Sequence, residues 1–140
     1  MKIAFICTGN SARSQMAEGF AKYFAKIYNK NKNIEIYSAG SNPTGYVHPL
    51  AIKVMKEISI DISNQYSKSL NEIPYKGLNL VITVCGDAKE TCPVIPGIKR
   101  EHWEIPDPVK FEGSEEEKLN YFRKIRDEIK ERVERLILSL

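Results

Sequence analysis

Short apolar runs alternate with segments of helical periodicity along this chain, and this alternation limits its possible folds. The runs that predict strands are residues 2–7, 34–37, 78–84 and 98–103. The helical patterns cover about residues 13–28, 49–58 and 114–138, with a shorter piece at about 86–91. Such alternation predicts an α/β fold of three layers, in which helices flank both faces of a central, four-stranded parallel sheet. The 140 residues, of which 42% are hydrophobic, predict one domain, residues 1–140.

The segment from Cys7 to Ser14 lies between the first predicted strand and the first predicted helix. The backbone N–H groups of such a loop, with the start of the helix, can surround a tetrahedral oxyanion. The guanidinium of Arg13 can hold two oxygens at once, and the same positive field favours the thiolate of Cys7, which is its nucleophilic form. We therefore predict a nucleophile at Cys7 and an anion site in the loop. The predicted substrate-binding residues are Thr8, Gly9, Asn10, Ser11, Ala12, Arg13 and Ser14. The alternative is that Cys7 is a small buried hydrophobic residue.

Two other candidate residues follow predicted strands. Cys85 comes directly after the apolar run 78–84, and Asp107 follows the last predicted strand. Ligands of α/β folds bind at the carboxyl ends of the strands, so Cys7, Cys85 and Asp107 are expected at one rim of the sheet. The alternative for Asp107 is a turn residue before Pro108.

Cys85 and Cys92 form a second constellation. A helix would separate their Cα atoms by about 10.5 Å, whereas a disulfide requires about 7 Å or less. The segment between the two cysteines contains weak helix formers such as Gly86, and Pro93 directly after it prevents a helix from continuing. We hypothesise that it is helical when reduced and looped out when oxidised, and equal amide-exchange protection in both states would contradict this. The alternatives are two structural cysteines or a metal site, for which the spacing is a poor match.

Charge, cysteine count and hydropathy exclude several classes of protein. The net charge is +3, and no dense basic run carries interleaved aromatic residues, so nucleic-acid binding is not expected. No apolar run is long enough to span a membrane, and the N-terminal run is too short for a signal peptide. An odd number of cysteines, three, does not form a disulfide scaffold. We expect a cytoplasmic monomer without a bound metal or cofactor.

With these motifs in hand, the chain resembles the thioredoxin-coupled arsenate reductases, which share the fold of the low-molecular-weight protein tyrosine phosphatases. The resemblance covers nearly the whole chain. Its motifs are Cys7–Ser11, Arg13–Glu18, Tyr37–Gly40, Asp61–Asn64, Cys85–Ala88, Cys92–Pro93 and Glu101–Trp103.

The resemblance implies a relay of three thiols. Cys7 would attack arsenate held by Arg13 and the loop, with Asp107 as the general acid. Cys85 would then displace arsenite from Cys7, Cys92 would take over the disulfide, and thioredoxin or a similar reductant would reduce it. Phosphate and sulfate would mimic arsenate, and a weak phosphatase activity is implied as well.

Two positions depart from this family's pattern. Position 12 is alanine where many relatives have a second loop cysteine, which the relay does not need. Some of these reductases place potassium beside the loop, and Asn10, Glu18 and Ser38 match that site, whereas its acidic position falls on Lys68. An ammonium there would replace the cation, so we predict no stimulation by potassium.

Two other functions compete with arsenate reduction. A phosphotyrosine phosphatase would need only Cys7, Arg13 and Asp107, but Cys85 and Cys92 would then be idle. In addition, phosphatases of this fold usually place an aromatic residue just after the acid. In this chain Asp107 is followed by Pro108, Val109 and Lys110, none of which is aromatic. A thiol redox sensor or anion-binding module is a third reading, for which no effector surface is evident.

Overall fold

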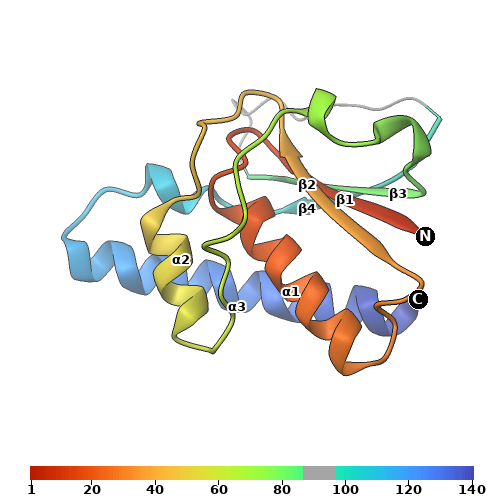
Figure 1. The fold of residues 1–140 in the computed structure, drawn as a ribbon. Coiled ribbons are helices and arrows are strands. Elements are labelled where there is room, and N and C mark those ends of the chain that lie inside the picture. Colours follow the sequence, from red (N-terminus) through yellow and green to blue (C-terminus); the bar gives the residue numbers. More distant parts are fainter. Residues whose placement is uncertain (87–96) are drawn as a thin grey trace.

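The chain folds around a four-stranded sheet with three α-helices (Figure 1). The structure is a computed structural model, and it describes residues 1–86 and 97–140. The strands are β1 (Lys2–Cys7), β2 (Glu35–Gly40), β3 (Leu80–Cys85) and β4 (Lys99–Glu104). The α-helices are α1 (Arg13–Ile27), α2 (Pro49–Lys56) and α3 (Glu115–Ser139), and the 3₁₀ turns are η1 (Leu70–Glu72), η2 (Tyr75–Gly77) and η3 (Pro108–Lys110). All four predicted strands and the three long predicted helices are present. Most of the short helical piece predicted at 86–91, and the redox hypothesis for this segment, lie outside the described residues.

The sheet is parallel throughout, with the strand order β2-β1-β3-β4. Cys7 at the end of β1 pairs with Gly40 at the end of β2, and Cys85 at the end of β3 pairs with Glu104. The carboxyl ends of all four strands therefore meet at one edge. This is the edge at which ligands of parallel sheets bind.

The three α-helices all lie against one face of the sheet (Figure 1). A large hydrophobic cluster on this face joins β1 and β3 to all three helices through side chains such as Phe5, Phe20 and Phe122. The described part of the other face is covered by the segment around η1 and η2, whose Ile73 and Leu78 pack on Ile6. The three-layer fold is confirmed. Within residues 1–86 and 97–140, the helical turns on this second face are of the 3₁₀ type.

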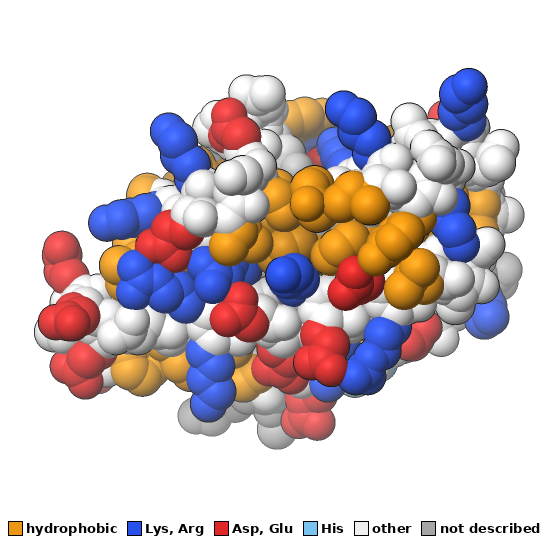
Figure 2. Space-filling view, turned by 90° about the horizontal axis from the view of Figure 1, so that it is seen from below, with side chains coloured by type: hydrophobic (Ala, Val, Ile, Leu, Met, Phe, Trp, Pro, Cys, Tyr) orange, Lys and Arg blue, Asp and Glu red, His pale blue; other side chains and the backbone are white. Residues whose placement is uncertain are grey.

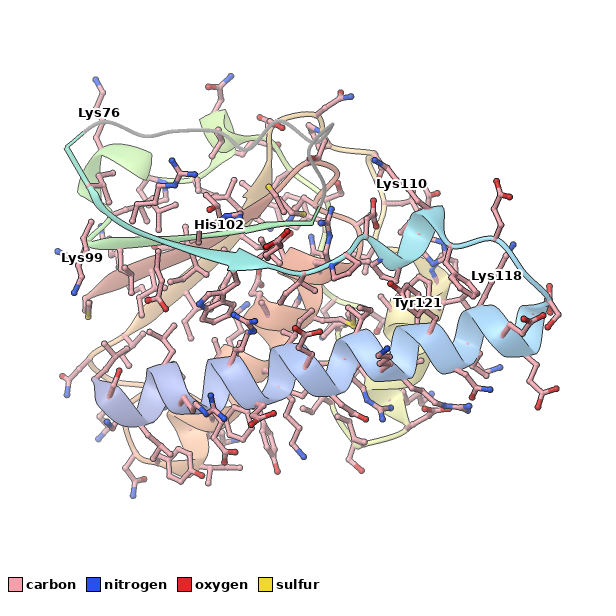
Figure 3. The ribbon with its side chains drawn as sticks, turned by 180° about the vertical axis from the view of Figure 1, so that it is seen from behind. Lys76, Lys99, His102, Lys110, Lys118 and Tyr121 are labelled. Atoms are coloured by element: carbon pink, nitrogen blue, oxygen red, sulfur yellow. The ribbon has the colours of Figure 1, made fainter. Side chains whose placement is uncertain are left out.

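Helix α3 begins at a capping box, in which the Ser114 hydroxyl accepts a hydrogen bond from the Glu117 N–H at 3.1 Å. Its buried stripe crosses the sheet towards β4, where Trp103 is buried with its ring 5.9 Å from that of Phe5. Seen from behind, the η3 turn that carries Lys110 lies near the N-terminal part of this helix (Figure 3).

The helical face carries charges of both signs, interspersed around a strip of hydrophobic side chains (Figure 2). Over the described residues, no helix combines the length and the apolar character that crossing a membrane requires.

Candidate active site

A cavity of about 200 Å³ opens over the loop between β1 and α1. Its lining residues are Cys7, Thr8, Gly9, Ser11, Ala12, Arg13, Asn42, Thr44, Asp107, Val109 and Lys110. A cavity of about 430 Å³ lies on the other side of Val109, between α2 and α3, but is lined by none of the predicted catalytic residues. We therefore place the candidate active site in the smaller cavity.

Cys7 is a free cysteine, only 2% exposed, at the bottom of this site. Its Sγ lies 2.8 Å from Ser14 Oγ and accepts a hydrogen bond from the Asn10 N–H at 3.2 Å. Cys7 also belongs to the hydrophobic core, as the alternative interpretation expects. A sulfur that contacts a hydroxyl and an amide N–H nevertheless has the surroundings that stabilise a thiolate.

Asn10 holds the loop in shape. Its backbone has a left-handed φ of 47°, which asparagine tolerates better than most residues. Its Nδ2 donates to Ser14 Oγ at 2.8 Å and to Ser38 Oγ at 3.1 Å, while its Oδ1 accepts from the Lys68 N–H at 2.9 Å. Asn10 therefore orients the hydroxyl that contacts Cys7.

The chain after β2 binds the outer side of the loop. Loop carbonyls accept hydrogen bonds from backbone N–H groups of residues 41–48: the pairs are Ser41 with Cys7, Asn42 with Thr8, Thr44 with Gly9 and His48 with Ser11. A trans peptide directs its C=O and N–H in opposite directions. The Gly9 carbonyl thus faces Thr44, while the next N–H, that of Asn10, faces Cys7.

The N-terminus of α1 has no side-chain cap, since Ala12 occupies the N-cap and the first turn contains no acidic residue. The positive end of the helix is therefore left to whatever enters the cavity. This supports the anion site predicted for Cys7–Ser14.

Arg13 and Asp107 meet above this loop. The Arg13 side chain is 2% exposed; its NH1 donates to the Ile105 carbonyl at 3.0 Å, and its NH2 lies 3.6 Å from Asp107 Oδ2. Asp107 caps η3, where its Oδ1 accepts from the Val109 N–H at 3.0 Å. The structure thus brings together the predicted nucleophile, arginine and acid.

Cys85 ends the adjacent strand at the same rim and is buried. Ile6 pairs with Thr83, so Cys7 stands beside Val84, which shares its core cluster. Alternate side chains of a strand point to opposite faces, so the side chain of Cys85 leaves the strand towards the other face of the sheet. Cys85 is disulfide-bonded and Cys7 is not. Cys92 lies outside the described residues.

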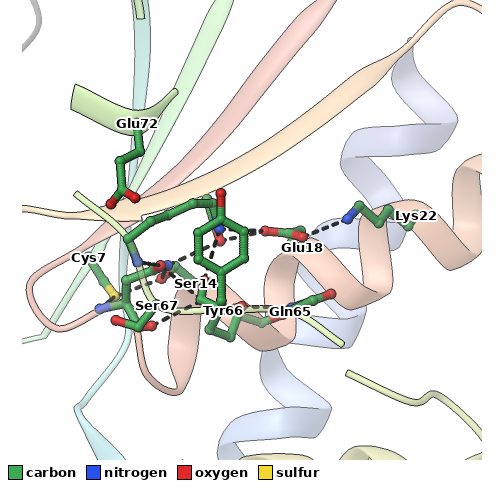
Figure 4. Close-up of polar contacts among 12 residues, drawn as sticks. Cys7, Ser14, Glu18, Lys22, Gln65, Tyr66, Ser67 and Glu72 are labelled. Carbon is green, nitrogen blue, oxygen red and sulfur yellow. Dashed lines mark hydrogen bonds and ion pairs between the residues drawn. The ribbon is translucent and has the colours of Figure 1, made fainter. Parts of the chain in front are cut away.

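Glu18 forms a buried ion pair with Lys68 beside the loop, and its contact with Lys22 is drawn in Figure 4. Glu18 accepts a hydrogen bond from Ser38 Oγ at 2.5 Å and contacts the ammonium groups of Lys22 and Lys68 at 2.6 and 3.6 Å. The Lys68 ammonium also donates to the Tyr66 carbonyl at 3.1 Å and lies over the ring of that tyrosine. Burial lowers the pKa of Lys68, and Glu18 opposes this shift. Asn10, Glu18, Ser38 and Lys68 thus converge, as the family resemblance implied.

Sequence reasoning missed four residues that line the cavity, Asn42, Thr44, Val109 and Lys110. A signal for the first two was present, because the turn-rich segment at 41–45 follows a predicted strand and so lies at the ligand-binding rim. Among the residues that the structure describes, no group of His, Cys, Asp or Glu side chains could hold a metal ion.

Residues 2–140 match the family described as low molecular weight phosphotyrosine protein phosphatase, and the chain belongs to this family. Among its curated relatives, the arsenate reductase of Bacillus subtilis is 47% identical over 132 residues, which cover 94% of this chain and 91% of the relative. The arsenate reductase of Bacillus licheniformis is 49% identical over 135 residues, covering 95% and 92%. The family resemblance drawn from the motifs is confirmed.

Solved structures show the same fold. An arsenate reductase in the phosphate binding state superposes with a TM-score of 0.78 at 35% identity, covering 99% of this chain and 97% of that chain. A thioredoxin-dependent arsenate reductase of Corynebacterium glutamicum has a TM-score of 0.72 at 30% identity, covering 99% and 60%. A low molecular weight protein tyrosine phosphatase from T. tengcongensis has a TM-score of 0.78 at 26% identity, covering 100% and 99%.

Proposed function

We propose that this protein reduces arsenate to arsenite by a relay of three cysteines, with thioredoxin or a similar protein as the reductant. The observation that carries the proposal is the cavity lined by Cys7, Arg13 and Asp107, with Cys85 at the end of the adjacent strand. Relatives that are called arsenate reductases, at 47% and 49% identity, support the choice of substrate.

The first step uses the cavity. Arsenate binds to the loop N–H groups, the N-terminus of α1 and Arg13, and the Cys7 thiolate attacks the arsenic. An oxygen of arsenate leaves as water, and protonated Asp107 supplies a proton to it. The 3.6 Å separation of Asp107 from Arg13 supports a shared anion site, because both residues line the same cavity.

The second step transfers two electrons. The Cys85 thiolate attacks Cys7 Sγ, the S–As bond breaks, and its electron pair stays on arsenic, which leaves as arsenite. The product is a Cys7–Cys85 disulfide. Because the side chain of Cys85 leaves β3 towards the opposite face, the chain after Val84 has to change its path in this step.

The third step restores the nucleophile. Cys92 attacks Cys85 Sγ, so that Cys7 leaves as a thiolate and a Cys85–Cys92 disulfide remains. Two thiols of the reductant then reduce this disulfide by two electrons. The free state of Cys7 and the disulfide-bonded state of Cys85 support this order. We propose that the protein acts as a cytoplasmic monomer, since a reducing compartment returns its thiols after each turnover.

A phosphotyrosine phosphatase activity is the second candidate, and the family itself favours it. The cavity with Cys7, Arg13 and Asp107 would stabilise the transition state of phosphoester hydrolysis as well. We expect this activity to be weak beside arsenate reduction, because it leaves Cys85 and Cys92 without a role.

The test is arsenate-dependent oxidation of NADPH in the presence of thioredoxin and thioredoxin reductase. We expect multiple turnovers for the wild type and their loss for Cys92→Ser. The control is Ser139→Ala, at an exposed position at the end of α3, which keeps full activity. If the wild type shows no turnover but hydrolyses an aryl phosphate in a Cys7-dependent way, the protein is a phosphatase and the relay is wrong.

A further inference from the structure

Gly86 follows Cys85 and lies against the backbone that precedes Asp107. A Cβ placed on Gly86 would stand 2.3 Å from the Ile105 carbonyl oxygen and 2.5 Å from Pro106 Cα. Both atoms belong to the main chain, so they cannot move aside as the end of a flexible side chain would. Only glycine permits this approach. Gly86 itself does not line the oxyanion cavity.

Ile105 connects this contact to the anion site. Its N–H donates to the Cys85 carbonyl at 3.2 Å, and its own carbonyl accepts the hydrogen bond from Arg13 NH1 at 3.0 Å. One peptide segment therefore touches the cysteine segment on one side and the guanidinium on the other.

The anchor at Ile105 fixes the direction of the Arg13 fork. The guanidinium is planar, so holding NH1 at the Ile105 carbonyl and NH2 near Asp107 sets the plane of the whole group. Bidentate binding of an oxyanion depends on that plane. The Arg13 side chain is only 2% exposed, so bulk water has little access to the position of the Ile105 carbonyl.

We propose that Gly86 is a positioning residue for oxyanion binding, which acts through the Ile105 carbonyl on Arg13. The inference rests on the proposed oxyanion site and extends it to a residue outside the cavity. A side chain at position 86 displaces the carbonyl, Arg13 loses its anchor, and the guanidinium no longer meets the anion in the bidentate orientation. The loss corresponds to one hydrogen bond to a charged group, which is about tenfold in affinity.

The first experiment measures phosphate binding by calorimetry for the wild type and Gly86→Ala. The matched control is Gly77→Ala, because an added Cβ there meets only the Lys2 side chain, at 3.5 Å and beyond. We expect about tenfold weaker binding for Gly86→Ala and wild-type binding for Gly77→Ala. Wild-type binding by Gly86→Ala would overturn the inference and leave the oxyanion site intact, whereas a wild type that binds no phosphate would overturn the site itself.

A double-mutant cycle separates positioning from general damage. Lysine has no planar fork for Ile105 to orient, so in an Arg13→Lys background Gly86→Ala should weaken phosphate binding by less than twofold. Full additivity of the two losses would show that Gly86 acts by another route and would contradict the proposal.

A measurement on the wild type covers the case in which Gly86→Ala does not fold. The ¹⁵N spectrum of Arg13 should show slowed rotation of the guanidinium in the phosphate-free protein, because the Ile105 carbonyl holds NH1. Fast rotation, as for a solvent-exposed arginine, would overturn the anchor.

Discussion

At the scale of single residues, the site depends on small polar groups around one sulfur. Cys7 contacts the Ser14 hydroxyl and the Asn10 N–H, and Asn10 in turn holds Ser14. The spacing of Cys7 and Arg13 predicted that both lie at one site, because both side chains have a chemistry that can be recognised in the sequence. The anchor at Ile105 could not be predicted, because a backbone carbonyl is common to every residue.

Ser14→Ala should slow the reaction of Cys7. The variant removes a hydrogen bond to the thiolate, and one hydrogen bond to a charged group corresponds to about tenfold in rate. The measurement is alkylation of the reduced protein by iodoacetamide, with Ser139→Ala at the end of α3 as the control. Equal rates for Ser14→Ala and the wild type would show that the hydroxyl does not support the thiolate.

Potassium should leave the activity unchanged. The Lys68 ammonium already lies 3.6 Å from Glu18 and 3.1 Å from the Tyr66 carbonyl, where a monovalent cation would compete with it. The check is arsenate-dependent turnover with sodium chloride replaced by potassium chloride at the same ionic strength. A clear rise in activity with potassium would refute this prediction.

At the scale of elements, the three α-helices differ in how their N-termini are capped. Helix α1 has no side-chain cap at its N-terminus. Helix α2 is capped by His48, whose Nδ1 accepts a hydrogen bond from the Leu50 N–H at 3.1 Å. The Pro49 in the first turn of α2 and the capping box of α3 made these starts predictable. The cover of the second face was not predictable in the same way, since 59–77 has no periodic pattern.

His48 should make the stability depend on pH. Burial lowers its pKa below the usual value of 6.5, and the negative charge of Asp107 opposes this shift. As the pH falls below 6.5, the unfolded chain gains a proton at His48 that the folded chain resists, so the unfolding free energy decreases.

The matching variant is His48→Asn, because asparagine also caps a helix but does not titrate. We expect urea unfolding between pH 5 and pH 7 to show a smaller decrease on acidification than in the wild type. The second histidine, His102, is present in both proteins. An unchanged pH dependence would mean that His48 protonates freely in the folded protein.

At the scale of the whole molecule, four separate parts of the chain build the candidate site and support its loop. They are the loop after β1, the segment 41–48 after β2, the segment 65–69 and the residues that follow β4. The alternation of strands and helices predicted this convergence, since it places all carboxyl ends at one edge. Contacts such as Gln65 with Gln15 could not be predicted, because polar residues in irregular segments carry no pattern.

Phosphate should therefore stabilise the whole fold. A ligand that binds only the folded state adds about 2.7 kcal/mol to the unfolding free energy at one hundred times its Kd. The measurement is urea unfolding in phosphate compared with chloride at equal ionic strength. Arg13→Lys should gain less than the wild type, and an equal gain would mean that phosphate acts elsewhere.

The burial of Trp103 against Phe5 gives the protein a built-in optical probe. Trp103 is the only tryptophan of the chain, so fluorescence excited selectively in tryptophan comes from one position. That position is on β4, the strand at the edge of the sheet. Its indole also lines the cavity between β4 and the last turns of α3. Stopped-flow fluorescence therefore follows the unfolding of this edge of the sheet without any label, and a spectral shift towards the red marks the moment at which water reaches Trp103.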